Sequence, residues 1–372
     1  MGLRRKKRSR IVIPIFLIVM LGVVSGGVYF AMSLPVLTKQ AQQVQVASPA
    51  ATQTPYLAIG KEKMKSGQLK DAAKAFEAAT QLDPQNVDAF TQWTKVLTLL
   101  YQPSQAISAG EWAVRLDPRN SMALANLAKA YDWNDEYDKA IETALKALDI
   151  DPQNVAATAY LAEAYADKVL WEKALSTAQK AVRMDDTSIE AHRNLGYVLE
   201  KQGAYDQAIK EYQRAIELGP GLAYLYLDLG SVFRGQRHDE EAIAAFQKMS
   251  ELQPDQPRGY HSIGLVYYNQ ENYPLAIDMF QRALQADPEY GPPLEYLGWS
   301  YYIQMDYQNA ADYFAKAVAV APKDAERQAA LGWSLYNLKQ YAEARTSFQK
   351  AFELDPNLDL AKKGLAATEG KP

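Results

Sequence analysis

The sequence predicts an all-α solenoid, in which pairs of short helices repeat along the chain behind a single N-terminal membrane-spanning helix. Three observations carry this prediction. Prolines recur at an interval of 34 residues, small residues occupy fixed places within that interval, and apolar residues recur at helical spacing on both sides of a short turn. A fixed period of ~20–50 residues is typical of repeat architectures.

The N-terminal segment carries the signal of a membrane span. Residues 11–34 contain no charged side chain, and at a rise of about 1.5 Å per residue they reach ~36 Å, beyond the ~30 Å hydrocarbon core. This apolar stretch is longer than the roughly 7–15 residues of a signal peptide, so we expect an uncleaved signal-anchor, with a cleaved signal peptide as the alternative. A basic block precedes it: Arg4, Arg5, Lys6, Lys7, Arg8 and Arg10.

The basic block also predicts the orientation. Positive residues stay on the cytoplasmic side of a membrane span, so residues 1–10 are expected to form a cytoplasmic tail and the rest of the chain to be extracytoplasmic. If residues 11–34 were cleaved, the rest would be secreted. Residues 35–54 are rich in Gln, Ala, Thr and Pro without an apolar face, which indicates a flexible linker before a repeat domain at 55–368.

Composition excludes several classes of function. The first ten residues hold six of the 40 basic residues, which leaves 34 basic against 44 acidic residues in the rest of the chain. A body that acidic is not expected to bind nucleic acid, for which a basic face supplies most of the affinity. The chain has no cysteine, so disulfides, thiol catalysis and cysteine-ligated metals are excluded.

Prolines define the period. They stand at residues 84, 118, 152, 220, 254, 288, 322 and 356, and Asp186 replaces the one that is missing from the series. We number positions 1 to 34 within each unit. Nine such units begin at Gln53, Val87, Ser121, Val155, Ile189, Ala223, Pro257, Gly291 and Ala325.

Small and aromatic residues occupy matching places in these units. Position 20 is alanine in all nine, and position 8 is glycine in six units and Thr94, Ala128 or Ala162 in the others. Position 24 is aromatic except at Gly110, Ala144 and Ala178. We expect the small residues at positions 8 and 20 to let two helix backbones approach, and the larger residue at position 24 to pack against the neighbouring pair.

Apolar spacing assigns two amphipathic helices to each unit. Positions 4, 7, 8 and 11 share one helical face, and positions 20, 24, 27 and 30 share another. The Asp-Pro pair near position 31 ends the second helix, because a residue before proline avoids the α region. One more helix after Pro356 is expected to cap the array, with Leu358, Ala361 and Leu365 inward and Lys362 and Lys363 toward water.

The pattern resembles the tetratricopeptide repeat. One full instance combines Gly264, Tyr267, Ala276, Phe280, Ala283 and Pro288, and residues 297–322 form another. The resemblance implies a right-handed α-solenoid whose first helices line a concave, protein-binding groove. The family's carboxylate clamp is not matched, because no unit has lysine at position 5 or asparagine at position 9.

No catalytic constellation is recognisable. The three histidines, His192, His238 and His261, lack a second histidine at metal-ligand spacing, and no phosphate-binding loop or nucleophile motif is present. We therefore predict no enzyme activity, no catalytic residue, no bound metal and no cofactor.

The resemblance places positions 2, 5, 9, 12 and 13 on the groove wall. The first four units supply mostly small and charged side chains there, whereas the later units supply aromatic and arginine side chains, which are the usual anchors of recognition surfaces. The alternative is that these rings only pack on one another. The predicted partner-binding residues are Arg193, Tyr197, Tyr224, Arg234, Arg258, His261, Tyr268, Trp299, Tyr302, Trp333 and Tyr336.

These features predict a membrane-anchored scaffold or adaptor that binds polypeptides, with a role in cell-envelope assembly. Two alternatives stay open from the sequence. The repeats could stack on other copies as a self-associating structural protein, or the aromatic side chains could bind glycans of the cell envelope.

Overall fold

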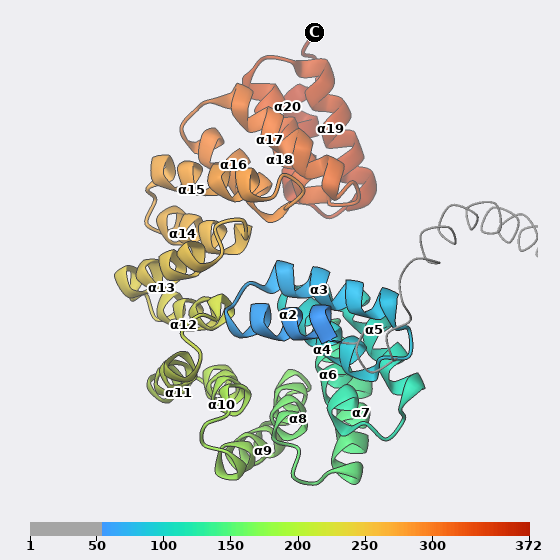
Figure 1. The fold of residues 1–372 in the computed structure, drawn as a ribbon. Helices are drawn as coiled ribbons and strands as arrows, with labels where there is room; N and C mark the ends of the chain where they lie inside the picture. The colour runs from blue at the N-terminus through green and yellow to red at the C-terminus, as the bar shows by residue number, and fades with distance from the viewer. Residues whose placement is uncertain (1–53) are drawn as a thin grey trace, which may run out of the picture. The chain divides into compact units, whose positions relative to one another are not determined.

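A computed structural model of the chain describes residues 54–372, which form α-helices joined by short turns and contain no strand (Figure 1). The helices come in pairs. The first helices are α2 (Thr54–Lys65), α4 (Val87–Leu99), α6 (Ser121–Asp132), α8 (Val155–Asp167), α10 (Ile189–Lys201), α12 (Ala223–Gly235), α14 (Pro257–Asn269), α16 (Pro292–Ile303) and α18 (Ala325–Asn337).

The second helices run α3 (Leu69–Leu82), α5 (Pro103–Leu116), α7 (Tyr137–Ile150), α9 (Trp171–Met184), α11 (Tyr205–Leu218), α13 (Asp239–Leu252), α15 (Tyr273–Ala286), α17 (Tyr307–Val320) and α19 (Tyr341–Leu354). A last helix, α20 (Asp359–Thr368), follows. Each second helix packs on its own first helix and on the first helix of the next pair, as expected of a helical solenoid.

The recurring Asp-Pro-x-Asn tetrapeptide both ends one helix and starts the next. At its first occurrence the Asp83 carboxylate accepts the backbone N–H of Gln85 at 3.1 Å. Asn86 then caps α4, since its side-chain oxygen accepts the N–H of Ala89 at 2.9 Å. Asn120 and Asn154 cap α6 and α8 in the same way. Sequence analysis identified the helix stop and missed this capping role.

The turn inside each pair places position 15 in the left-handed region of backbone space. This holds for Gly67 and Gly203, and also for the non-glycine residues Tyr101, Asp135, Val169, Arg237, Glu271, Met305 and Lys339, whose φ lies between 58° and 64°. The following N–H closes the helix end; the N–H of Leu170, for instance, donates to Tyr165 O at 2.8 Å. This is a Schellman-type end, which favours glycine at the left-handed residue.

Inside each pair, the aromatic ring at position 24 packs on the glycine at position 8. A Cβ added to Gly196 would lie 2.9 Å from the Tyr212 ring, so glycine makes room for the ring. In the second pair the sizes are reversed: position 24 is Gly110, and a Cβ there would lie 3.1 Å from Thr94 Cγ2 of position 8. In the third and fourth pairs both positions are alanine. The expectation that position 8 serves only backbone approach was therefore incomplete.

The array closes on itself in its N-terminal part. Side chains of α3 and α4 share one apolar cluster with α11 and α12, in which Phe76, Val96 and Leu225 are fully buried. Figure 1 shows α2 beside α12, although the two helices are far apart along the chain. Gln253 Nε2 donates to Gly67 O at 3.3 Å, and Lys70 Nζ lies 2.5 Å from Asp255 Oδ2. We call this set of contacts the closure.

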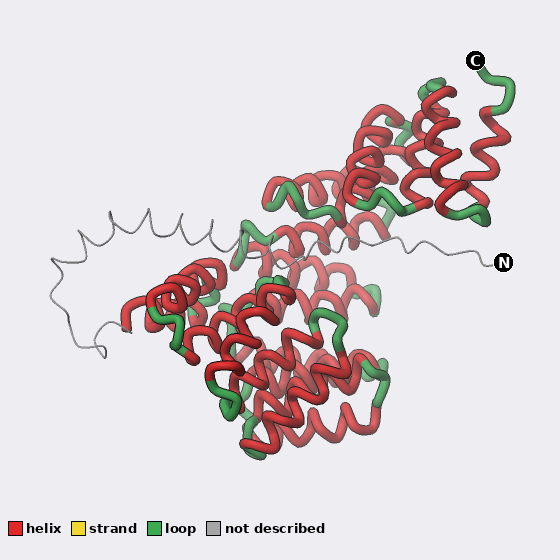
Figure 2. Tube along the Cα trace, turned by 90° about the vertical axis from the view of Figure 1, so that its right-hand side faces the viewer, coloured by secondary structure: helices red, strands yellow, loops and turns green. Residues whose placement is uncertain are grey.

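The C-terminal repeats lie outside the closure and end in the expected cap. Ala361 of α20 is fully buried with Ala329 and Ala351, while Lys362 and Lys363 are exposed. In Figure 2 the helices up to the C-terminus extend away from the closed part.

Among the helices of residues 54–372, none has the length and apolar character needed to cross a membrane. The predicted membrane span at 11–34, and the tail and most of the linker around it, lie outside the described residues.

Candidate protein-binding groove

The closure divides the predicted groove into a covered part and an open part. Neighbouring first helices lie side by side, so residues at the same position form a column along the inner wall. The covered part contains three of the predicted residues, Arg193 and Tyr197 on α10 and Tyr224 on α12. In the open part, Tyr268, Trp299, Tyr302, Trp333 and Tyr336 come from α14, α16 and α18.

Arg193 is the centre of a buried charge network. It is 5% exposed, its Nη1 pairs with Glu163, and its Nε donates to Asp228 Oδ2 at 2.8 Å. Burial alone would lower the pKa of the Arg193 guanidinium, but Asp228 and Glu163 raise it well above its usual range. Arg193 thus fastens α10 to α8 and α12, and its guanidinium does not reach solvent.

A second cation, Lys129, lies beside it on α6. Its Nζ is 5.1 Å from the Trp133 ring and 4.7 Å from the Tyr160 ring, and it is 4% exposed. Burial and the neighbouring Arg193 lower the pKa of Lys129 to about 8. The covered part is therefore an internal polar core rather than a free binding wall.

The neighbouring acids are also enclosed. Asp132 is 4% exposed, and burial together with Glu163 and Asp167 raises the pKa of its carboxyl well above the usual range. One carboxylate oxygen each of Asp132 and Glu163 has no hydrogen-bond partner among the described residues. Tyr197 caps the end of this cluster through its hydroxyl, 2.5 Å from Asp167 Oδ1.

Tyr224 and Arg258 belong to the closure itself. Tyr224 is 7% exposed in the apolar cluster shared with α3 and α4. The Arg258 guanidinium carbon lies 3.6 Å from the ring centroid of Tyr101, a residue of the α4–α5 turn. Cation–π contacts of this kind contribute about 0.5–2 kcal/mol.

Arg234 and His261 lie between the two parts and are half-buried. His261 Nδ1 is 3.3 Å from the Tyr290 hydroxyl, and its ring lies among Phe280, Tyr290 and Tyr296. Burial and the nearby arginines Arg234 and Arg258 lower the pKa of His261 to about 4, so it is neutral at physiological pH. Within residues 54–372, no group of three or more His, Cys, Asp or Glu side chains could hold a metal ion.

The open part presents aromatic side chains that are held in place from behind. Trp299 and Trp333, both at position 9, meet the Phe314 and Phe348 rings edge-on at 5.1 and 5.2 Å. All five open-part aromatics are half-buried, so one side of each packs and the other is accessible. Packing and binding are thus compatible roles for these rings.

The tyrosines at position 12 repeat one arrangement three times. Tyr268, Tyr302 and Tyr336 each meet the tyrosine at position 17 in a T-shaped contact, with centroid distances of 5.6, 5.4 and 5.3 Å. Asn337 Nδ2 donates to the Tyr302 hydroxyl at 3.0 Å and links neighbouring repeats. The result is a regular aromatic column with fixed ring orientations.

Models of the tetratricopeptide repeat match residues 54–86, 102–155, 134–189, 189–222, 257–290 and 325–358. Together these matches cover more than half of the chain. The chain belongs to the tetratricopeptide repeat family. The matched segments fall on the helix pairs described above, and the count of nine repeats remains a prediction from the period.

Solved structures support the tetratricopeptide solenoid as the fold. The crystal structure of the APC/C hetero-tetramer Cut9–Hcn1 contains a similar chain, with a TM-score of 0.59 and 19% identity over 80% of this chain and 59% of that one. This chain therefore spans less than two thirds of that relative's length. The crystal structure of MamA matches at 31% identity over 44% of this chain and 95% of that chain, but its TM-score of 0.37 carries no argument.

No curated protein shows significant similarity to the chain. The tetratricopeptide repeats and the shared architecture support a protein–protein interaction scaffold, a fold that is typically non-catalytic. That the chain lacks enzyme activity remains a prediction.

Sequence analysis placed all eleven predicted residues on one wall because it read them from their positions in the repeat. It missed the residues that cover part of that wall, chiefly Tyr101, Lys70 and Asp255. Tyr101 stands at position 15 of its repeat, where the backbone adopts a positive φ. The sequence analysis assigned no contact with another repeat to this position. An aromatic residue at such a turn was the available signal.

Proposed function

We propose that this tetratricopeptide repeat protein is a membrane-anchored scaffold that binds a polypeptide segment along its open C-terminal groove. The observation that carries the proposal is the aromatic column of Tyr268, Trp299, Tyr302, Trp333 and Tyr336. These rings are half-exposed, follow one another at the repeat spacing and belong to helices outside the closure. Large aromatic side chains are enriched among the residues that dominate protein interfaces.

Fixed ring orientations favour binding. Ordering a flexible side chain at an interface costs roughly 0.5–1.5 kcal/mol, and a ring already held by a T-shaped neighbour avoids most of this cost. The T-shaped contacts at Tyr302 and Tyr336 supply that preorganisation. An extended segment that crosses several repeats would meet equivalent rings in succession, which suits a partner with spaced apolar side chains.

Site-specific photo-crosslinking in the native cells tests the groove. A photoreactive phenylalanine analogue would replace Tyr302 or Tyr336, and a matched control would carry it at Val320, which is 59% exposed on α17. We expect adducts with a second polypeptide at the two groove positions and not at Val320. Equal labelling at all three positions, or none in the groove, would refute the proposal. Adducts at the mass of a homodimer would favour self-association instead.

The membrane anchor is part of the proposal and needs its own test. The apolar residues 11–34 and the preceding basic block support an uncleaved span with the repeats in the extracytoplasmic space. Confinement to a membrane would raise the effective concentration of a partner there, consistent with a role in envelope assembly. Full-length protein should resist alkaline extraction from membranes, and its repeats should be cut by protease added from the extracytoplasmic side. Extraction into the soluble fraction would exclude the anchor.

A further inference from the structure

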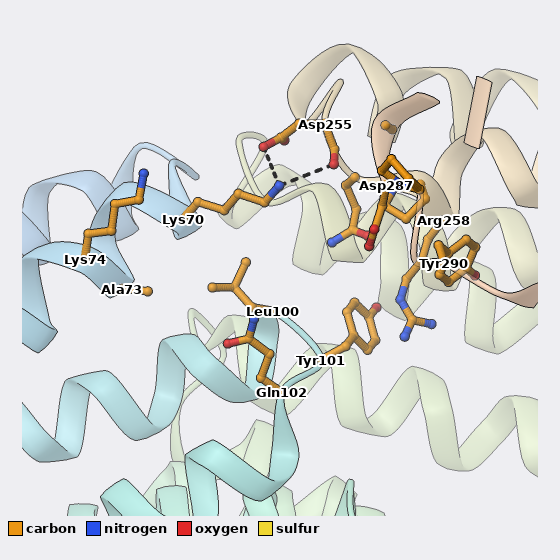
Figure 3. Close-up of a pocket in the computed structure, with 14 residues that line it drawn as sticks. Lys70, Ala73, Lys74, Leu100, Tyr101, Gln102, Asp255, Arg258, Asp287 and Tyr290 are labelled. Atoms are coloured by element: carbon orange, nitrogen blue, oxygen red, sulfur yellow. Dashed lines mark hydrogen bonds and ion pairs between the residues drawn. The ribbon is translucent and has the colours of Figure 1, made fainter. Parts of the chain in front are cut away.

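The closure creates a pocket that is separate from the open part of the groove. It has a volume of about 630 Å³ and lies between α3, the α4–α5 turn, the start of α14 and the α15–α16 turn (Figure 3). The two sides come from segments about 185 residues apart, joined by Lys70 and Asp255. Small-molecule sites occupy about 300–1,000 Å³, so this pocket is large enough for one.

Cations line the pocket from both sides of the closure. Lys70 is neutralised by Asp255 at 2.5 Å. Arg258 and Lys74 also line the pocket, and neither forms an ion pair with a carboxylate among residues 54–372. The Arg258 guanidinium stacks on the Tyr101 ring, which leaves its N–H groups at the rim of the ring available to donate hydrogen bonds to an oxyanion.

The acids in the pocket cancel only part of this charge. Asp255 is engaged by Lys70, and Asp287 accepts the backbone N–H of Glu289 at 3.0 Å. The pocket thus holds three cations against two carboxylates, in a protein whose net charge is −4.

The start of α14 adds to the positive potential. Gln256 makes no side-chain capping hydrogen bond, and the first turn of this 13-residue helix contains no acidic residue. Uncapped N–H groups at a helix start carry partial positive charge. These N–H groups adjoin Arg258, so the helix end and the guanidinium both make the electrostatic potential of this region of the pocket more positive.

The remaining walls combine apolar and aromatic side chains with the amides of Gln102 and Gln256. Figure 3 shows Tyr101 and Tyr290 on either side of Arg258, with Leu100 and Ala73 farther away on the side of α3. This combination suits a ligand with a charged end and an apolar body. We propose that the pocket binds an anionic small molecule, whose carboxylate or phosphate group contacts Arg258 and whose body packs against Tyr101 and the α3 side of the pocket.

Such a ligand would contact both sides of the closure. Because it would bind only the closed form, it would stabilise that form in proportion to its saturation. This inference is independent of the polypeptide-binding groove, since none of the open-part aromatics lines the pocket.

Calorimetry on the full-length protein tests the pocket, with phenyl phosphate, benzoate and inorganic phosphate as probes at constant ionic strength. The first two probes separate phosphate from carboxylate recognition, and the third lacks the apolar body. We expect saturable binding of phenyl phosphate or benzoate, and weaker binding of inorganic phosphate. Arg258→Ala should weaken binding by about tenfold or more, the value of a charge-assisted hydrogen-bonded contact.

A second variant and a control keep the test decisive. Arg258→Ala also removes the contact with Tyr101, whereas Lys74→Ala changes an exposed side chain and leaves the closure contacts intact. Lys74→Ala, at the opposite end of the pocket, should weaken binding less than Arg258→Ala does, and Lys350→Ala on α19 should leave it unchanged. Absence of saturable binding by any probe, an affinity of Arg258→Ala within twofold of wild type, or a larger loss for Lys74→Ala than for Arg258→Ala would overturn the proposal.

Discussion

The Phe280 ring lies directly on the backbone of Gly264, in the pair formed by α14 and α15. A Cβ at Gly264 would come within 2.5 Å of Phe280 Cε1, closer than any real Cβ contact. The same relationship recurs wherever position 24 is aromatic, and it is absent where Ala128 faces Ala144. Positions 8 and 24 of one repeat therefore form a coupled pair.

This coupling predicts that the effect of Gly264→Ala on the free energy of unfolding changes sign when the Phe280 ring is removed. Gly264→Ala alone should destabilise by about 1–3 kcal/mol through overpacking against the ring. In a Phe280→Ala background the clash is gone, so the same change should stabilise by up to ~1 kcal/mol through helix propensity. Urea unfolding of the four members of this double-mutant cycle measures the effect.

Ala128→Gly is the matched control, because no ring faces position 8 there. It should destabilise by roughly 0.5–1 kcal/mol, the ordinary cost of glycine in a helix. If Gly264→Ala destabilised the protein in both backgrounds, or stabilised it in both, contact with the Phe280 ring would not explain why position 8 is glycine.

The repeating elements of the fold were predictable because each depends on residues close in sequence. Amphipathic spacing, the Asp-Pro helix stop and the invariant alanine at position 20 all act within one unit, and that alanine is at most 1% exposed in every pair. The capping helix α20 followed from the same apolar spacing. Local rules of this kind hold wherever the period holds.

The closure was not predictable because it depends on the accumulated rotation of many repeats. Lys70 and Asp255 are 185 residues apart, and a small change of angle per repeat would separate them. The sequence does mark one point of contact, the Gly219-Pro220-Gly221 loop that follows the missing proline at Asp186. A Cβ on Gly67 would lie 2.1 Å from Gly221 O, so the α2–α3 turn meets the Gly219-Pro220-Gly221 loop where the regular proline period resumes.

The sequence predicts which repeat positions line the groove wall, but not which of those residues are exposed. Periodicity puts Arg193 and Trp333 on the same kind of wall, but it contains no information on whether another repeat covers that wall. In the structure Arg193 is 5% exposed, whereas Trp333 is half-buried beside an open groove and donates its Nε1–H to Leu360 O at 3.3 Å.

Val169 is predicted to be a strained residue whose replacement stabilises the protein. Its φ of 62° is left-handed, a conformation that costs a non-glycine residue roughly 1–2 kcal/mol and is least suited to a β-branched side chain. The side chain is 62% exposed, so little packing is lost. Val169→Gly should raise stability by about 0.5–1 kcal/mol after the entropy cost of glycine in the unfolded chain.

The reverse change provides the control. Gly203 occupies the equivalent position with φ of 78° and has no atom near its missing Cβ, so Gly203→Val should destabilise by about 1–2 kcal/mol without a steric clash. Thermal unfolding of both variants checks the pair. A lower melting temperature for Val169→Gly would show that the turn carries no strain.

Acid should weaken the ion pair that joins α4 to α10 through Glu190. Burial alone would raise the pKa of Glu190, but Lys95, 2.6 Å away on α4, outweighs burial and lowers that pKa to about 2 from its ordinary 4.5. A carboxyl whose folded pKa is lowered stabilises the protein above its unfolded pKa and loses this effect as pH falls. The contribution, on the order of 3 kcal/mol, should disappear between about pH 4.5 and pH 2.

Glu190→Gln isolates this effect. The variant should unfold at lower urea concentration than wild type at pH 7, and the difference should shrink as pH falls below about 4.5. Glu142→Gln removes an exposed, solvent-screened pair with Lys146 and should leave stability nearly unchanged at either pH. A difference for Glu190→Gln that stays constant with pH would contradict the assigned ion pair.

Arg193→Met should destabilise the protein far more than Arg234→Met, because Arg193 is covered and Arg234 lies toward the open groove. Arg193→Met would leave the buried Glu163 and the half-buried Asp228 without their cation, a change that typically costs about 3–5 kcal/mol. Arg234 is half-buried and forms no ion pair with the described residues, so Arg234→Met should cost about 1 kcal/mol or less. Adding Glu163→Gln and Asp228→Asn to Arg193→Met should restore part of the loss, which urea unfolding would detect. If Arg193→Met were as mild as Arg234→Met, Arg193 would be accessible in solution, and the covered part of the groove would be available to partners.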